Sequence, residues 1–126
     1  MMLQILGPAL GCVAAILLSV SARADSDTRA EQLAWECQGQ QPAEHPEIGL
    51  IRCTGYVGGG LLDMYSMMAD PRIGGGQPLV CLPADGISND QAIKIFLEWT
   101  SDHPEQLHNT ARITFLIALR FAFPCQ

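Results

Sequence analysis

Basic side chains are scarce in this sequence. Its 126 residues include 7 lysines and arginines against 13 aspartates and glutamates, which gives a formal net charge of −6 at pH 7. A surplus of carboxylates disfavours contact with the phosphates of nucleic acids and with anionic membrane surfaces. We therefore expect neither as a partner, whereas a basic protein would be attracted towards this chain.

A catalytic constellation is also missing. Two of the three histidines, His103 and His108, stand five residues apart with Pro104 between them. A zinc-protease motif instead needs two histidines four residues apart on one continuous helix. The four cysteines after residue 24 have expected oxidised partners. No carboxylate pair has a context that would separate its two pKa values. We predict that the protein is not an enzyme and uses no metal or cofactor.

The N-terminal residues have the pattern of a targeting segment. Residues 3–20 form an apolar run without charged side chains, and Ala22-Arg23-Ala24 follow as a small-x-small cleavage site. This pattern is typical of a secretory signal peptide. We predict a signal peptide at residues 1–24 and a single helical domain at residues 25–126, with a retained membrane anchor as the alternative.

Hydrophobic spacing after the cleavage site predicts four helices. They cover residues 27–38, residues 46–69, a segment from the cap at Ser88 to about Thr100, and a segment from the cap at Asn109 to about Phe121. Ser88 and Gln91, three residues apart, have the spacing of a capping box. Residues 70–86 hold three prolines and four glycines and predict a loop. No segment alternates at period two, so the predicted fold is all-α.

The exported part contains four cysteines, an even number that predicts two disulfides. Cys37 ends the first predicted helix and Cys53 lies early in the second, so an antiparallel hairpin would bring them together. Cys81 and Cys125 remain, both on non-helical segments that flank helices. We predict these two pairs, which give a small four-helix disulfide-stapled bundle.

The second predicted helix carries four glycines between Cys53 and Tyr65. Each glycine inside a helix costs about 1 kcal/mol relative to alanine, so we expect packing to offset the cost. Gly55 and Gly59 lie on a small-residue face that would let a neighbouring helix approach closely, and Tyr56 lies on a polar stripe beside it. The glycines match neither a P-loop nor a dinucleotide fingerprint, and the charged residues nearby argue against a transmembrane dimer helix.

Four ordered motifs cover nearly the whole exported part. They are Cys53-x-Gly55-Tyr56-x-x-Gly59, Cys81-Leu82-Pro83-x-x-Gly86-x-Ser88-x-x-Gln91, His103-Pro104-Glu105-x-x-His108 and Ala118-Leu119-x-x-Ala122-Phe123-Pro124-Cys125. Together they resemble the Rap/Tai family of type VI secretion amidase immunity proteins. The resemblance implies a periplasmic helical protein, often a homodimer, that binds a peptidoglycan amidase effector and occludes its active-site cleft. Asp63 stands about one position later than the family pattern expects, which allows for a slip or kink in the second helix.

A different function is also compatible with a small, exported, disulfide-bonded helical chain. It is a periplasmic stress chaperone of the HdeA-like kind, or another small helical binding module. Such a chaperone would expose apolar surface at low pH and suppress the aggregation of unrelated clients.

The last predicted helix also predicts an oligomer. From Asn109 to Phe123 the sequence is apolar nearly all round, and a helix of this kind is expected to be buried. One small domain covers only part of it, so we expect a homodimer, the commonest symmetric oligomer. Cover by the N-terminal helix is the alternative.

The loop at residues 70–78 is the candidate for the partner-binding segment. It is long for a connection between helices, and Arg72 and Ile73 offer a charged and an apolar anchor, with Asp70 and Gln77 beside them. The alternative is a plain solvated connector. A second loop, at residues 102–108, is polar and suits the rim of an interface better than its centre.

Overall fold

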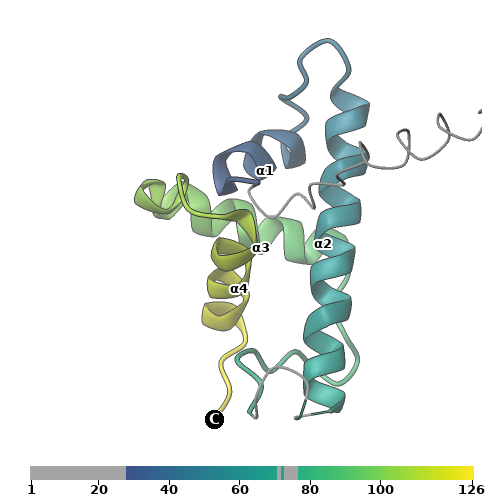
Figure 1. The fold of residues 1–126 in the computed structure, drawn as a ribbon, viewed down its shortest axis with the longest axis vertical. Helices are drawn as coiled ribbons and strands as arrows, with labels where there is room; N and C mark the ends of the chain where they lie inside the picture. Colours follow the sequence, from purple (N-terminus) through teal and green to yellow (C-terminus); the bar gives the residue numbers. More distant parts are fainter. Residues whose placement is uncertain (1–27, 71, 73–76) are drawn as a thin grey trace, which may run out of the picture.

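The computed structural model describes residues 28–70, 72 and 77–126. Four α-helices lie within them: α1 (Ala30–Cys37), α2 (Pro46–Ala69), α3 (Asn89–Asp102) and α4 (Ala111–Ala122), with a short 3-10 helix, η1 (Pro104–Gln106), before α4. α2 runs along the long axis of the molecule, and α3 crosses behind α2 and α4 (Figure 1). The described part has no strand beyond one isolated bridge. The predicted all-α class is confirmed, while the predicted signal peptide lies outside the described residues.

The helix boundaries follow local signals where those signals are strong. α2 has the predicted bounds, with Pro46 in its first turn, and it is an uninterrupted α-helix without the slip that the position of Asp63 allowed for. At the start of α3, Ser88 Oγ accepts a hydrogen bond from the Gln91 N–H at 3.1 Å, as a capping box requires. No helix among the described residues is long and apolar enough to cross a membrane.

The first turns of α1 and α4 are capped in a way that the sequence pattern did not predict. Neither helix has a side-chain cap. Instead, the Ala30 N–H donates to the Asn109 carbonyl at 2.8 Å, and the Ala111 N–H donates to the Thr28 carbonyl at 2.7 Å. These bonds satisfy N–H groups that a helix start leaves without a partner. The predicted cap at Asn109 is therefore wrong: its side-chain amide donates to Gln106 at 2.7 Å, and α4 begins two residues later.

The core lies where the four helices meet. The largest fully buried side chains come from all of them: Leu33, Cys53, Val57, Phe96, Thr114, Phe115 and Leu119. The rings of Phe96 and Phe115 make an edge contact with centroids 6.1 Å apart, a favoured geometry for aromatic pairs.

Both predicted disulfides are present. Cys37–Cys53 joins the end of α1 to α2, and Cys81–Cys125 joins the loop after α2 to the segment after α4. The predicted four-helix disulfide-stapled bundle is thus confirmed. A crosslink between distant segments stabilises the fold mainly by restricting the unfolded chain.

Some glycines of α2 lie against another segment of the chain, and others face open space. A Cβ at Gly60 would lie 2.8 Å from Phe115 Cε1, and one at Gly49 would clash with the Gln41 carbonyl oxygen. Gly49 is buried, whereas its neighbour Leu50 is 47% exposed. Positions 49 and 60 require glycine because another segment approaches closely.

Candidate functional site

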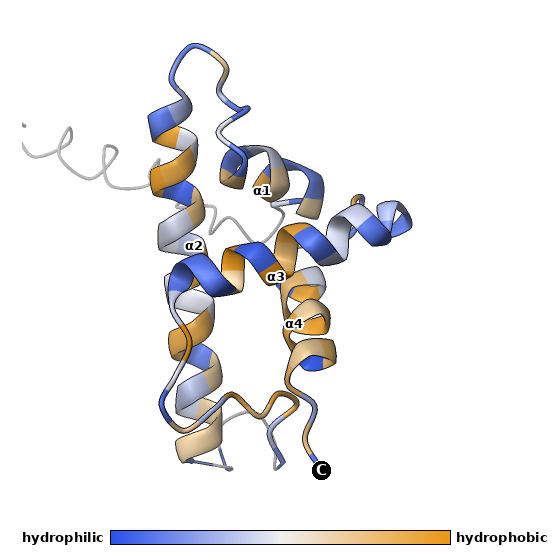
Figure 2. Cartoon of the chain, turned by 180° about the vertical axis from the view of Figure 1, so that it is seen from behind, coloured by the Kyte–Doolittle hydropathy of each residue, from blue (hydrophilic) through white to orange (hydrophobic). Residues whose placement is uncertain are grey.

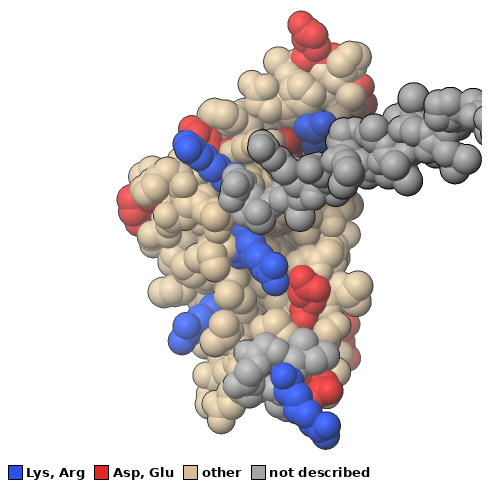
Figure 3. All heavy atoms as spheres, in the orientation of Figure 1, with Lys and Arg blue, Asp and Glu red and all other residues tan. Residues whose placement is uncertain are grey.

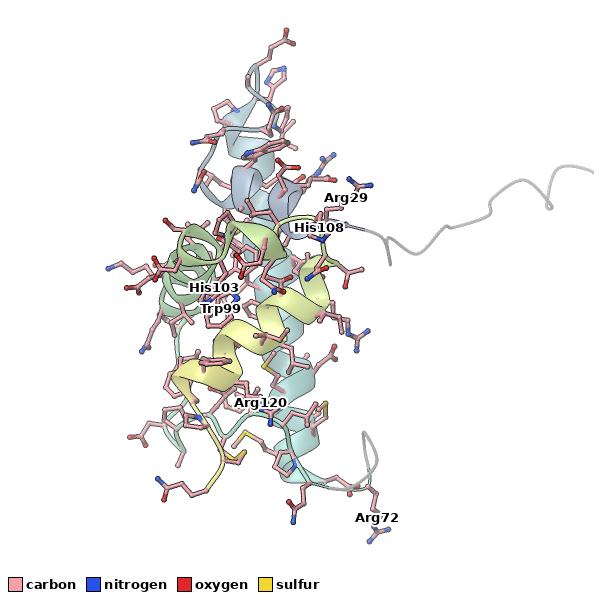
Figure 4. All side chains as sticks on the ribbon, turned by 90° about the vertical axis from the view of Figure 1, so that its left-hand side faces the viewer. Arg29, Arg72, Trp99, His103, His108 and Arg120 are labelled. Atoms are coloured by element: carbon pink, nitrogen blue, oxygen red, sulfur yellow. A yellow bond between two sulfur atoms is a disulfide. The ribbon has the colours of Figure 1, made fainter. Side chains whose placement is uncertain are left out.

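The predicted partner-binding loop begins at one end of the molecule, where α2 stops. Asp70 caps α2, and its Oδ1 accepts a hydrogen bond from the Arg72 N–H at 3.0 Å. The Arg72 side chain is 95% exposed and projects from this end (Figure 4). Gln77 is also exposed, while Ile73 lies outside the described residues. The described loop residues therefore place polar groups in solvent, and the predicted apolar anchor stays a prediction.

The far end of this loop is fixed to the body of the protein. Val80 and Leu82 are buried in the core on either side of Cys81, whose disulfide to Cys125 and whose N–H bond to the Phe123 carbonyl at 3.0 Å hold it against the C-terminal segment. α2 therefore fixes one end of this segment, and Cys81 fixes the other.

A hollow of about 410 Å³ lies between α2 and α4. We call it the α2–α4 groove; its lining residues are Gly55, Tyr56, Gly59, Gly60, Asp63, Met64 and Met67 from α2, and Arg112, Ile113, Phe115 and Leu116 from α4. Most of these side chains are apolar, and Ile113 is 50% exposed. At its mouth, Arg112 Nη2 lies 4.0 Å from Asp63 Oδ2, and both side chains are largely exposed.

This groove corrects the role predicted for Gly55 and Gly59. A Cβ at either position would meet no atom of the described chain within 4 Å. The close helix contact predicted for this face is therefore not made within one chain. Gly55 and Gly59 instead leave a bare strip of α2 backbone at the surface, beside the apolar side chains of α4.

A second pocket of about 390 Å³ adjoins the first between α1 and α2, and we call it the α1–α2 pocket. Gly55 and Tyr56 line both hollows, so Tyr56 of the predicted polar stripe stands at their junction. The other lining side chains are polar. Among them the buried Glu36 carboxylate accepts a hydrogen bond from Gln32 at 3.2 Å and lies 3.5 Å from the Arg52 guanidinium.

The histidines occupy structural positions rather than a common site. The His103 ring stacks on Trp99 with centroids 3.6 Å apart, and its Nδ1 lies 3.0 Å from the Trp99 carbonyl oxygen. His108 is exposed beyond η1, and His45 pairs with Glu47 at the start of α2. Across residues 28–70, 72 and 77–126, no three side chains of the metal-binding types gather closely enough to hold an ion.

The sequence pattern did not reveal the two hollows. The lining residues Arg112 and Ile113 belong to an apolar helix that was expected to be covered, and Glu36 belongs to a helix noted only for its apolar spacing. The available signal was the run of glycines at positions 55, 58, 59 and 60, because several glycines in one helix need a reason beyond helix formation. Helical periodicity placed Gly55 and Gly59 on one face of the helix, but it could not show which other segments lie beside that face.

Comparison with known proteins identifies one family. Residues 29–125 match the family model described as Rap1a immunity proteins, and this range extends from just before α1 to the last disulfide. Searches of curated proteins and of solved structures gave no significant match. The matched range includes all the described helices and every lining residue of the two hollows except Thr28.

Proposed function

This chain belongs to the Rap1a immunity protein family, and we propose that it binds and inhibits a peptidoglycan amidase effector of type VI secretion. The family match, which spans residues 29–125, is the observation that supports the proposal most strongly. An immunity protein acts by binding its effector, so its chemistry is that of an interface. The fold suits this task because two disulfides stabilise a small four-helix domain against unfolding, and an inhibitor that is already folded loses little entropy on binding.

The proposed site of action is the periplasm, reached through a signal peptide at residues 1–24. An amidase directed to the periplasm of a test bacterium should lyse the cells. Co-expression of the full chain should prevent lysis, whereas a chain that starts at residue 25 and stays in the cytoplasm should not. Equal protection by both forms would contradict the proposed location, and lysis in both cases would contradict the proposed function.

Occlusion of the amidase cleft is assigned to the loop at residues 70–78. Both of its ends are anchored, so the loop can enter a cleft without much loss of freedom. Alanine at both Arg72 and Ile73 should weaken inhibition, while the circular dichroism spectrum stays unchanged. Lys94→Ala on α3, also a loss of one exposed positive charge, is the matched control. An unchanged inhibition constant in the double variant would exclude this loop from the cleft.

We further propose that the protein is a homodimer. α4 is apolar along most of its length (Figure 2), and Phe121 at its end remains 70% exposed. Exposed apolar side chains of this size favour burial against another surface. Light scattering at tens of micromolar should give twice the mass of the chain, and a monomeric mass would remove the proposal.

A further inference from the structure

We propose that the α2–α4 groove and the adjoining α1–α2 pocket receive a segment of the effector in which apolar side chains alternate with carboxylates. This inference rests on the proposed function, and it adds a second contact to the loop that is assigned to the cleft. The groove and the loop are continuous, since Met67 lines the groove and Asp70 caps the same helix one turn later.

The groove has the surface that an apolar segment needs. Ile113 is half exposed, Met67 and Leu116 are partly exposed, and the bare backbone at Gly55 and Gly59 forms part of its wall. Two neighbouring hollows of about 410 and 390 Å³ together provide room for several side chains of a partner. An interface with a buried apolar centre of this kind concentrates its binding energy in a few anchors.

The arginines in and beside the two hollows favour a partner segment that carries carboxylates. Arg112 and Arg52 each line one of the hollows, and each lies near a carboxylate of the same lining, Asp63 at 4.0 Å and the buried Glu36 at 3.5 Å. Arg29 directly follows Thr28, which lines the α1–α2 pocket, and Arg120 lies one helical turn beyond Leu116 of the groove. Basic side chains are spread over this face with acidic side chains between them (Figure 3), and the labelled Arg29 and Arg72 extend from the same side of the molecule (Figure 4).

These arginines are available to a partner. Within the described part of the chain, Arg29 and Arg120 make no ion pair, and the Arg112–Asp63 pair is exposed at 4.0 Å. Exposed pairs of this kind are weak, so Arg112 can exchange Asp63 for a carboxylate of the effector. Local charge complementarity decides orientation and specificity at an interface. An acidic and apolar segment therefore fits this face, although the net charge of the whole chain is negative.

A second copy of the chain fits the same face less well. A symmetric dimer places the same patch on both sides of the interface. Arg112 and Arg52 already have Asp63 and Glu36 beside them, but Arg29 and Arg120 make no ion pair within the described residues, and a second copy would add two more such arginines to the interface without adding unpaired carboxylates. The exposed Phe121 beyond Arg120 leaves α4 another apolar contact for self-association.

The test uses the full exported chain and the candidate amidase, made inactive by replacement of its nucleophile. Ile113→Glu puts a negative charge into the groove, and Gly59→Leu fills the groove at a position where a Cβ has open space. The matched control is Leu50→Glu, since Leu50 is 47% exposed, close to the 50% of Ile113, and lines neither hollow. We expect the dissociation constant of the complex to rise about tenfold or more in both groove variants, as for loss of an interface anchor, and to stay nearly unchanged in the control.

Three outcomes would overturn the inference. If the wild-type chain binds the amidase and both groove variants bind equally well, the groove is not the docking surface, but the proposed function stands. If Gly59→Leu halves the mass seen by light scattering, a second copy occupies the groove. If the wild-type chain does not bind the amidase at all, the proposed function fails and the inference fails with it. Circular dichroism of each variant confirms the helical fold before binding is measured.

Discussion

Two adjacent glycines in α2 should respond in opposite ways to the same substitution. A Cβ at Gly59 enters open space, whereas one at Gly60 lies 2.8 Å from Phe115 Cε1 and 3.2 Å from Phe115 Cδ1. Phe115 is only 2% exposed and packs edge-on against Phe96, so it has little room to move. Alanine in a helix interior is favoured over glycine by about 1 kcal/mol, and both variants gain this amount.

Only Gly60→Ala is also destabilised by overpacking against Phe115, which costs about 1–3 kcal/mol. Gly59→Ala should therefore raise the free energy of unfolding by about 1 kcal/mol, and Gly60→Ala should be the less stable of the two by about 1–3 kcal/mol. For a domain of this size, 1 kcal/mol moves Tm by about 4–8 °C. Thermal and urea unfolding, followed by circular dichroism with the disulfides intact, measure the difference. Equal stability of the two variants would refute the description of the exposed and packed faces of α2.

Two further predictions concern the Cys81–Cys125 disulfide and the N-terminal cap of α3. Replacement of Cys81 and Cys125 by alanine should lower the free energy of unfolding by about 4 kcal/mol, because the disulfide closes a loop of more than 40 residues; urea unfolding that shows no loss would contradict this role. Ser88→Ala should cost about 1 kcal/mol through loss of the cap on the Gln91 N–H, and Ser88→Gly should cost less. A larger loss in the glycine variant would be inconsistent with a capping role.

The elements that the sequence predicted well are those with strong local signals. α2 begins at Pro46 and ends before a proline-rich loop, and both signals act within a few residues of the boundary. The disulfide pairing followed from the order of the helices, because an antiparallel hairpin leaves Cys37 and Cys53 as neighbours. Periodicity, loop composition and chain connectivity were sufficient for these features.

The features that were missed depend on segments far apart in the chain. The first turns of α1 and α4 cap each other through backbone bonds between residues about 80 positions apart, and no local pattern encodes such a contact. The helical wheel likewise placed Gly55 and Gly59 together on one face, but it could not show that this face stays open. The groove exists because α4 packs against Gly60 and leaves the two other glycines uncovered.

Inhibition of the effector by the purified chain is the decisive measurement for the proposed function. The chain from residue 25 to residue 126, with both disulfides formed, is titrated into the active candidate amidase, and release of peptide from peptidoglycan is measured. Hydrolysis should fall in proportion to the added protein and stop when each amidase molecule has one bound chain. Undiminished hydrolysis at a large excess of the chain, with no complex on size-exclusion chromatography, would contradict it.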